Sequence, residues 1–353
     1  MKFRGSAVSQ SPLGKRRRMK FSVIIAVRSI NDFLKENIIN LKKLDYEDFE
    51  VLLVLDEQER YDFADPRFHI ISIGKKGPGE KRNIGAQHAK GDIYVFLDDD
   101  AYPSRNWLVK AEEVFADKTV YALGAPAVTP PNAVFLERCS GRVLESWLSS
   151  AEAVYRYIPK RRMYIDDYPT VNLFVRKDAF WAVGGFTKEF WPGEDTKLCL
   201  DLSDRFGKFL YDPSPIVYHH RRILFKPHLK QISRYGTHRG QFARIYPKTS
   251  RRPSYFVPAL FVAGLLLGPA LAGVLAIFWV VYFAVLVVYL ALIVLEAAKV
   301  AIKDRNMPEA FYVGAGIILS HLVYGSYFVY GFFRRPVLKL KKIDTGTGNY
   351  IEG

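Results

Sequence analysis

Short apolar runs, each bounded by polar residues, recur through the first hundred positions of the chain. Runs of this kind are typical of strands buried in a parallel sheet. Between them lie segments with apolar residues at helical spacing, the first of which opens at a capping Asn31 or Asp32. The order strand, helix, strand, strand, helix, strand predicts a right-handed, mostly parallel α/β sheet. The expected strands are 21–27, 50–55, 68–73 and 93–97, and the expected helices are 31–44 and 80–90.

The fourth run ends in three consecutive carboxylates, Asp98, Asp99 and Asp100. Residues at the carboxyl ends of parallel strands lie where open α/β sheets bind their ligands. Three adjacent carboxylates repel one another, and a hard divalent cation carrying a diphosphate would compensate their charge. An acidic loop is an equal alternative, in which one aspartate caps a helix over residues 104–115. The residue types alone leave both interpretations open.

A second acidic pair, Glu194 and Asp195, stands at the expected start of a helix over residues 196–206. Carboxylates at such a position are ordinary capping residues. Combined with the first cluster, they would form a site in which one group holds metal and diphosphate while the other deprotonates an acceptor hydroxyl. Another acidic pair, Asp166 and Asp167, is expected in a solvated loop.

Other polar residues follow predicted strands. Val27 and Asp56 end two strands and should face the same crevice as the acidic cluster. Asp56 would accept a hydrogen bond from a base or a ribose there, or it serves only as a turn residue. The basic glycine loop over residues 74–79 precedes a helix start, a place suited to a phosphate. His219 and His220 form either a surface pair or ligands of an Mn²⁺-like ion.

The chain has 353 residues and a formal charge of +15, which permits an anionic substrate, a membrane surface or nucleic acid as partner. Ten Lys and Arg residues lie between Arg221 and Arg252, directly before a long apolar region. Such clusters bind anionic headgroups and stay on the cytoplasmic side of a membrane. We therefore expect interfacial amphipathic helices over residues 221–254 and no nucleic-acid partner; a solvated basic helix packed on the globular domain is the alternative. Two distant cysteines fit a reducing compartment.

Residues 255–335 are almost entirely apolar and predict membrane-spanning helices. The part before Ile302 is too long for one span of roughly 20 residues, and Gly268-Pro269 and Gly273 indicate a break. The basic tail over residues 336–353 favours two crossings, with the first stretch re-entrant or interfacial; three crossings are the alternative. Glycines in the last span suit close helix packing, and His321 there is expected to form a helix–helix hydrogen bond.

Six short segments occur together in order. They are Ser22-Val-Ile-Ile25, Val54-Leu-Asp56, Lys81-Arg-Asn-Ile-Gly85, Phe96-Leu-Asp-Asp-Asp100, Asn172-Leu-Phe-Val-Arg176 with Gly184-Gly-Phe186, and Gly193-Glu-Asp195. Jointly they resemble the family 2 glycosyltransferases of the GT-A fold, over about two-thirds of the chain. The sequence departs from that family at Ala26-Val27-Arg28, where a Pro-Thr-Tyr-like sequence is usual. Gln231-Ile-Ser-Arg-Tyr235 replaces the Gln-X-X-Arg-Trp of processive synthases, which argues against polymer synthesis.

The resemblance implies specific roles. Asp195 would be the general base of an inverting displacement, with Glu194 supporting it. Asp100 would bind Mn²⁺ or Mg²⁺, Asp98 would contact the ribose or a metal-bound water, and His219 or His220 would complete the metal shell. The other residues expected to bind the nucleotide sugar are Val27, Asp56, Lys81, Arg82, Asn83, Asp99 and Arg234.

We thus expect a GT-A domain over residues 21–220 after a disordered basic tail over residues 1–20. The enzyme would move a sugar from a nucleotide-sugar donor to a lipid-linked glycan, in cell-surface polysaccharide or glycan biosynthesis. Its catalytic domain would lie at the cytoplasmic face of the cell membrane, beside anionic headgroups. A polyprenyl-phosphate glycosyl synthase and a non-catalytic nucleotide-binding scaffold are the alternatives. The sugar, the nucleotide, the acceptor and a homo-oligomeric state stay open.

Overall fold

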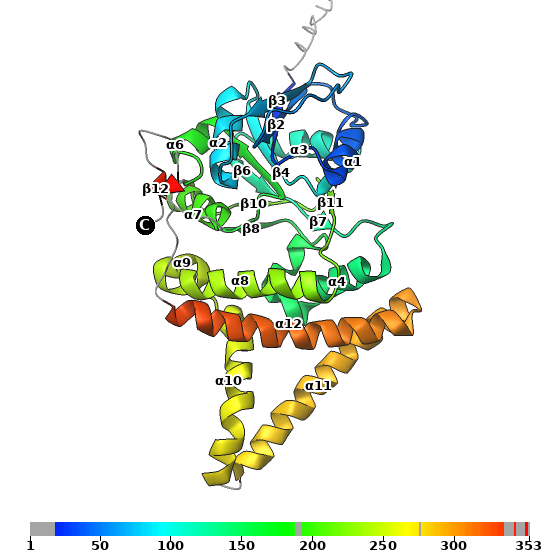
Figure 1. Ribbon diagram of the computed structural model, residues 1–353, viewed down its shortest axis with the longest axis vertical. Coiled ribbons are helices and arrows are strands. Elements are labelled where there is room, and N and C mark those ends of the chain that lie inside the picture. The colour runs from blue at the N-terminus through cyan, green and yellow to red at the C-terminus, as the bar shows by residue number, and fades with distance from the viewer. Residues whose placement is uncertain (1–17, 188–192, 275–276, 335–341, 344–349, 352–353) are drawn as a thin grey trace, which may run out of the picture.

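The computed structural model describes residues 18–187, 193–274, 277–334, 342–343 and 350–351. Nearly all of the two expected basic tails therefore lies outside the described residues. Figure 1 shows an α/β domain resting on a layer of long helices, from which two further helices project as a V.

An eight-stranded sheet forms the centre of the α/β domain. In spatial order its strands are β3 (Phe68–Ser72), β2 (Phe49–Leu55), β1 (Phe21–Ala26), β4 (Ile93–Leu97), β9 (Asn172–Arg176), β6 (Ala122–Gly124), β10 (Phe209–Tyr211) and β8 (Met163–Ile165). Strand β1 pairs in parallel with both β2 and β4, so Phe21 lies opposite Phe49 and Ile93. Strand β9 runs antiparallel to β4 and β6, and β8 runs antiparallel to β10. The predicted mostly parallel α/β sheet is confirmed.

Successive side chains of the central strands enter two separate cores. Val23 and Ile25 of β1 pack on one face of the sheet, and Ile24 packs on the other. Because both faces are covered, the strands are continuous apolar runs instead of alternating ones. The first face is covered by α1 (Asp32–Leu41) and α3 (Trp107–Phe115), and the second by α2 (Pro78–His88), α6 (Lys177–Ala182) and α7 (Glu194–Phe206).

A small second sheet flanks the acidic cluster. Strand β11 (Val217–His219) lies between β5 (Ala101–Pro103) and β7 (Ala127–Val128). His219 pairs with Ala101, which sets the imidazole beside Asp100. The helix expected from residue 104 instead begins at Trp107, because the residues before it pair with a distant strand that local periodicity cannot reveal.

Two long helices, α8 (Lys226–Ile245) and α12 (Met307–Phe333), lie side by side under the α/β domain (Figure 1). Gly240 of α8 faces the α12 backbone so closely that a Cβ there would overlap the carbonyl oxygen of Phe328. Gly331 of α12 similarly meets the backbone of Thr237, so the close packing expected of these glycines is present. The other elements are α4 (Phe135–Glu145), α5 (Trp147–Ser150), η1 (Ala151–Arg156), α9 (Pro247–Ser250), β12 (Lys342–Ile343) and β13 (Tyr350–Ile351).

Within the described part of the chain, three helices are long and apolar enough to cross a membrane: α10 (Pro253–Val274), α11 (Ile277–Asp304) and α12. In the most apolar part of α10 and of α11 only 6% of the residues are buried, against 44% in α12. Helix α10 continues past Gly268 and Pro269 and ends at Val274, so the break expected at Gly268-Pro269 is wrong and the helix instead ends just after Gly273. His321 of α12 and Tyr289 of α11 form the predicted helix–helix hydrogen bond at 3.0 Å.

Candidate active site

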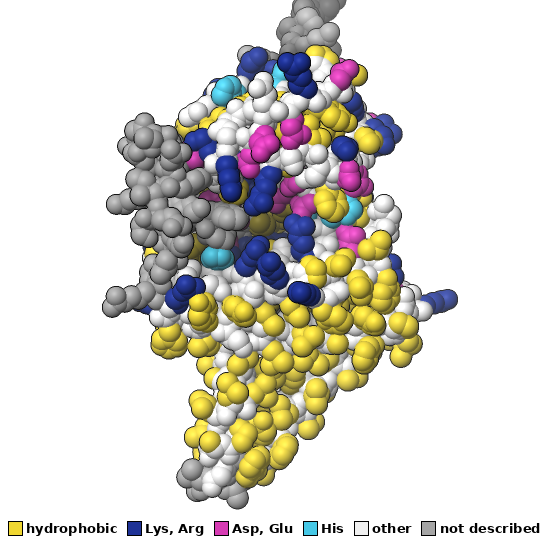
Figure 2. Space-filling model, in the orientation of Figure 1, with side chains coloured by type: hydrophobic (Ala, Val, Ile, Leu, Met, Phe, Trp, Pro, Cys, Tyr) yellow, Lys and Arg dark blue, Asp and Glu magenta, His cyan; other side chains and the backbone are white. Residues whose placement is uncertain are grey.

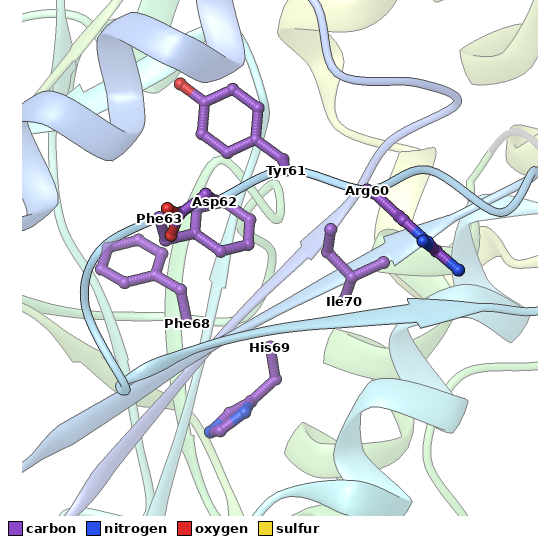
Figure 3. Close-up of a pocket in the computed structure, with 7 residues that line it drawn as sticks. All are labelled: Arg60, Tyr61, Asp62, Phe63, Phe68, His69 and Ile70. Carbon is purple, nitrogen blue, oxygen red and sulfur yellow. The ribbon is translucent and has the colours of Figure 1, made fainter.

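Two hollows differ sharply in the chemistry that they offer. One, of about 600 Å³, is a depression at the outer edge of the sheet beside β3. Figure 3 shows its aromatic wall, where Phe63 and Phe68 stack with ring centroids 5.4 Å apart and His69 points away from Tyr61. None of the predicted site residues, all of which the structure describes, lines this depression. Its only carboxylate is Asp62, so it is a poor candidate for the predicted chemistry.

The second cavity, of about 450 Å³, lies between the α/β domain and the helices beneath it. Asp98 and Asp100 line it from the carboxyl end of β4, and Glu194 and Asp195 line it from the start of α7. Figure 2 shows a hollow at this level, rimmed by both basic and acidic side chains. The structure thus brings together the two acidic segments that the sequence separates. Their catalytic roles stay a prediction.

One guanidinium connects the two acidic segments. Arg82 of α2 donates to Asp98 Oδ1 at 3.0 Å and to Glu194 Oε1 at 2.9 Å. The side chains of Arg82 and Glu194 are each only 7% exposed, so these charge-assisted bonds are little screened by water. Glu194 is therefore held as a partner of Arg82, which leaves Asp195 as the carboxylate available for proton transfer.

Two basic side chains contact the carboxylate of Asp100. It accepts from Arg222 at 3.0 Å and lies 3.2 Å from His219 Nε2. Burial alone would favour the neutral acid, but the interactions with His219 and Arg222 hold the pKa of Asp100 at about 2. An ionised carboxylate oxygen at the end of a strand is a good ligand for Mg²⁺ or Mn²⁺.

The histidines fit the predicted metal shell less well. Arg221 Nη1 donates to His219 Nδ1 at 2.8 Å, so His219 presents its Nε2–H to Asp100. His220 is engaged at both nitrogens, with Glu137 at 2.9 Å and Glu36 at 2.8 Å. Within the described residues no group of three or more His, Cys, Asp or Glu side chains is arranged to hold a metal ion. These contacts therefore fit an ion that Asp100 binds directly and whose other ligands are substrate phosphates and water. His219 would then orient the Asp100 carboxylate.

Asp195 has the pKa of a general base. It lies partly buried at the first turn of α7, with its Oδ1 accepting from the amide of Thr196 at 2.7 Å. Burial raises the pKa of Asp195 to about 7, and the negative charges of Glu194 and Asp167 contribute to the shift. A base with a pKa near the working pH can both accept and release a proton efficiently.

Four predicted nucleotide-binding residues make contacts within the protein itself. Lys81 is buried, donates to the carbonyl oxygen of Val27 at 2.5 Å and pairs with Asp56. It thereby ties together the ends of β1 and β2. Asn83 is bonded to the backbone of Phe186 at 2.7 and 2.8 Å. These residues shape the strand-end edge of the domain.

Asp99 and Arg234 point elsewhere than expected. Asp99 accepts from Asn31 at 2.6 Å, and Asn31 in turn caps α1 by accepting from the Leu34 amide at 2.9 Å. Burial raises the pKa of Asp99, with the neighbouring carboxylates adding to it. Arg234 of α8 is exposed and does not line the cavity, whereas Tyr235 beside it does.

The expectation that Asp167 lies in a solvated loop is wrong. Asp167 is 3% exposed and accepts from Arg156 at 3.1 Å and from Arg239 at 2.6 Å. Both arginines line the cavity, and neither stood out in the sequence. The arginines come from η1 and α8, so the cluster exists only because α8 folds back under the sheet. Burial would raise the pKa of Asp167, but these two cations lower it below its usual range.

Residues 22–184 match the family model described as glycosyl transferase family 2. A pre-mycofactocin glycosyltransferase of Mycobacterium tuberculosis is 31% identical over 193 residues, which cover 54% of this chain and 39% of the relative. Glycosyltransferase AglE of Haloferax volcanii is 29% identical over 127 residues, or 36% of this chain and 38% of the relative. The chain thus spans about two-fifths of the length of the curated relatives that it matches.

Among solved structures, a similar fold occurs in the mannosyltransferase PcManGT from Pyrobaculum calidifontis, in complex with GDP-Man and Mn²⁺. The superposition has a TM-score of 0.56 at 17% identity and covers 90% of this chain and 88% of that one. At this identity the likeness concerns the fold alone. It agrees with the GT-A-like α/β domain described above, whereas Glu194 and Asp195 lie beyond the matched family segment and are placed by the structure.

Proposed function

We propose that the protein is a membrane-bound, metal-dependent, inverting glycosyltransferase, because residues 22–184 match the family model described as glycosyl transferase family 2. It transfers a sugar from a nucleotide-sugar donor to a lipid-linked acceptor at the cytoplasmic face of the cell membrane, in glycan or cell-surface polysaccharide synthesis. The observation that carries this proposal is the single cavity in which Asp98 and Asp100 meet Asp195.

The donor occupies the strand-end side of the cavity. Asp100 holds the divalent ion, with Asp98 contacting the ribose or a water of the ion. When bound, the ion stabilises the negative charge that develops on the departing nucleoside diphosphate. Arg222 is 51% exposed and pairs with Asp100 at 3.0 Å, so its guanidinium is available to the phosphate oxygens. Arg82 holds Asp98 in place through its 3.0 Å bond.

Asp195 serves the acceptor. The acceptor oxygen forms a bond to C1 of the donor sugar as the bond from C1 to the diphosphate oxygen breaks. The acceptor proton passes to Asp195, and the nucleoside diphosphate leaves with the bonding electron pair. Attack on the side opposite the leaving group inverts the configuration at C1. The raised pKa of Asp195 lets it hold that proton at neutral pH.

The lengths and exposures of the apolar helices support a position of this cavity beside a bilayer. Helix α10 has 22 residues and is about 33 Å long, enough to cross the hydrocarbon core. Leu266 of α10 and Val280 of α11 are 74% and 65% exposed, as lipid-facing side chains would be. We infer that α10 and α11 cross the membrane as a hairpin, while the half-buried α12 lies at the interface against α8. Both ends of the hairpin then lie on the side of the catalytic domain (Figure 1).

A polyprenyl-phosphate glycosyl synthase is the second candidate, and it differs only in the acceptor. The two arginines at the inner end of the cavity favour it, since they suit an acceptor that carries a phosphate. An acceptor test distinguishes the two functions: the purified enzyme either glycosylates plain polyprenyl phosphate or requires an existing lipid-linked glycan.

The proposed donor site is tested by thermal unfolding of the full chain in detergent with nucleoside diphosphates, with and without Mn²⁺. A ligand that binds only the folded state raises the melting temperature. We expect one nucleotide to stabilise the protein more than the others and to do so more strongly with Mn²⁺. Equal melting temperatures with every nucleotide, with and without metal, would count against a nucleotide-sugar enzyme.

A further inference from the structure

At the inner end of the cavity, the positive charge of two arginines exceeds the negative charge of the one carboxylate that both of them contact. Arg156 and Arg239 both donate to the one carboxylate of Asp167. The side chains of the two arginines are 15% and 16% exposed, and that of Asp167 is 4% exposed. Two guanidinium charges thus face one carboxylate in a region that water enters poorly, and such a surplus favours an anionic ligand.

Three residues that line the same cavity carry buried polar atoms without partners in the described structure. Ser149 Oγ, Arg156 Nε and Tyr324 Oη are buried and have no hydrogen-bond partner among the residues that the structure describes. All three residues line the cavity. Buried polar groups in folded proteins are almost always hydrogen-bonded, so these atoms indicate a ligand. A guanidinium N–H and two hydroxyls are donors suited to the oxygens of a phosphate.

These donors lie at the membrane side of the molecule. Ser149 belongs to α5 and Tyr324 to α12, and Arg239 lies 4.9 Å above the ring of Tyr255 at the start of α10. Asp195 lines the same cavity. A phosphate held here would therefore sit between the membrane helices and the proposed base. The carboxylates proposed to serve the nucleotide sugar, Asp98 and Asp100, lie instead at the carboxyl end of β4.

A purely structural role for the two arginines and Asp167 explains fewer of these observations than a binding site does. A structural ion pair would connect α8 to the α/β domain with one arginine for one carboxylate, and it would leave no unpartnered donors. Arg252 and Asp166 form a pair of that kind nearby, and neither lines the cavity.

We propose that Arg156 and Arg239, together with Tyr324 and Ser149, form a binding site for the phosphate of a lipid acceptor. Where the acceptor is a lipid-linked glycan, the site places its reacting hydroxyl beside Asp195; a plain lipid phosphate would attack through its own ionised oxygen, without a base. In both cases the lipid chain leaves toward α10 and α12. This inference rests on the proposed function, because it names the acceptor class of the same cavity.

The test measures binding of farnesyl phosphate, farnesol and inorganic phosphate to the full chain in detergent. We expect farnesyl phosphate to bind at least about tenfold more tightly than farnesol, because a charge-assisted bond is worth roughly a factor of ten or more. Inorganic phosphate should bind far more weakly than farnesyl phosphate. Equal affinities of farnesyl phosphate and farnesol would overturn the site, and equal affinities of farnesyl phosphate and inorganic phosphate would overturn its assignment to a lipid.

Two variants test whether the lipid phosphate binds at Arg156 and Tyr324. Arg156→Gln should abolish the preference for farnesyl phosphate over farnesol. Tyr324→Phe removes only a hydroxyl that has no partner in the described structure, so it should fold normally and weaken farnesyl phosphate about threefold to tenfold. Arg244→Gln is the control, since Arg244 lies on the same helix but bonds the Phe332 carbonyl outside the cavity. Retained preference in both cavity variants would overturn the proposal.

The same samples are titrated with GDP and UDP in the presence of Mn²⁺. Nucleotide binding that is intact, without any preference for farnesyl phosphate, would overturn this inference and leave the donor site standing. Absence of binding by either nucleotide would instead count against the proposed function itself. Farnesyl phosphate and the nucleotide should bind together without competing, because they use different residues.

Discussion

Asp98 and Glu194, which follow different strands of the sheet, are held by the same guanidinium. Arg82 spans the two carboxylates with bonds of 3.0 and 2.9 Å. One consequence is electrostatic, since a buried cation between two acidic segments offsets the repulsion between their negative charges. The other is geometric, because the distance between the donor side and the acceptor side of the cavity is fixed by one rigid planar group.

Replacement of Arg82 tests this connection. In Arg82→Lys the ammonium group is a single point charge that cannot bridge both carboxylates, so one of them loses its partner. We expect kcat/KM for sugar transfer to fall about 10-fold to 100-fold, in line with the loss of a buried charged hydrogen bond. Arg67→Lys is the matched control, because Arg67 pairs with Asp65 outside the cavity. Full activity of Arg82→Lys would show that the bridge is dispensable.

The pH dependence of transfer follows from Asp195. The pKa of this carboxyl is raised to about 7 by burial and neighbouring negative charge, and a general base acts only when deprotonated. The rate of transfer should therefore rise with pH, reach half its maximum near pH 7 and level off above about pH 8. A steady-state rate profile under conditions where chemistry is limiting measures this. A flat profile between pH 5.5 and 8.5 would contradict the assignment.

Ionisation of Asp195 should lower the stability of the fold as the pH rises, whereas it should raise the rate of transfer. Because the folded-state pKa of Asp195 lies above the unfolded value of about 3.9, its contribution to stability is present at low pH and is lost as the pH rises through about 7. Asp195→Asn cannot ionise, so it should melt at a higher temperature than the wild type at pH 8, and the difference should shrink steadily as the pH falls toward the unfolded pKa of about 3.9. Asp201→Asn, on the same helix and paired with Lys197, serves as the control. A lower melting temperature for Asp195→Asn at pH 8 would argue against a raised pKa.

Three variants near the proposed metal site should differ in how much Mn²⁺ increases their affinity for a nucleoside diphosphate. Asp100→Asn should abolish the increase in nucleoside diphosphate affinity that Mn²⁺ produces, as should a chelator acting on the wild type. His219→Ala should weaken the Mn²⁺ effect by about tenfold without removing it, since second-sphere groups typically matter to that extent. His220→Gln should leave it unchanged, because His220 bonds Glu36 and Glu137 instead of Asp100. Complete loss in His219→Ala would make that imidazole a direct ligand.

Cysteine labelling tests the membrane arrangement. In a background without Cys139 and Cys199, Arg305→Cys and Arg334→Cys mark the two ends of α12, and Gly273→Cys marks the far end of α10. An impermeant maleimide should label both ends of α12 from the side of the catalytic domain and position 273 from the opposite side. Labelling of positions 305 and 334 from opposite sides would make α12 a third crossing.

The local pattern of apolar and polar residues was sufficient to predict much of the fold. The apolar runs of β1 and β4 and the polar residues that follow them predict buried parallel strands with ligand-binding ends, because that relationship depends on a few adjacent residues. The positions of Asp100 and Asp195 could be singled out because carboxylates at element boundaries are chemically conspicuous. Their meeting in one cavity required the chain to fold between them.

The features that sequence reasoning missed all depend on contacts between distant residues. Asp167 looked like a loop residue, yet Arg239 from α8 buries it. Residues 101–103 join a sheet with β11 because their partner arrives much later in the chain. Similarly, α12 has the composition of a membrane span, and its packing against α8 alone distinguishes it from α10 and α11. No window of local sequence contains these partners.

The central claim is that Asp195 removes the acceptor proton in a cavity shared with Asp98 and Asp100. The most direct test follows transfer of radiolabelled sugar from nucleotide sugars to lipid extract, comparing the full-length wild type with Asp195→Asn. We predict that the variant binds the nucleoside diphosphate as tightly as the wild type and transfers sugar about 100-fold to 10,000-fold more slowly. Transfer at the wild-type rate by Asp195→Asn, with nucleotide binding intact, would contradict the account.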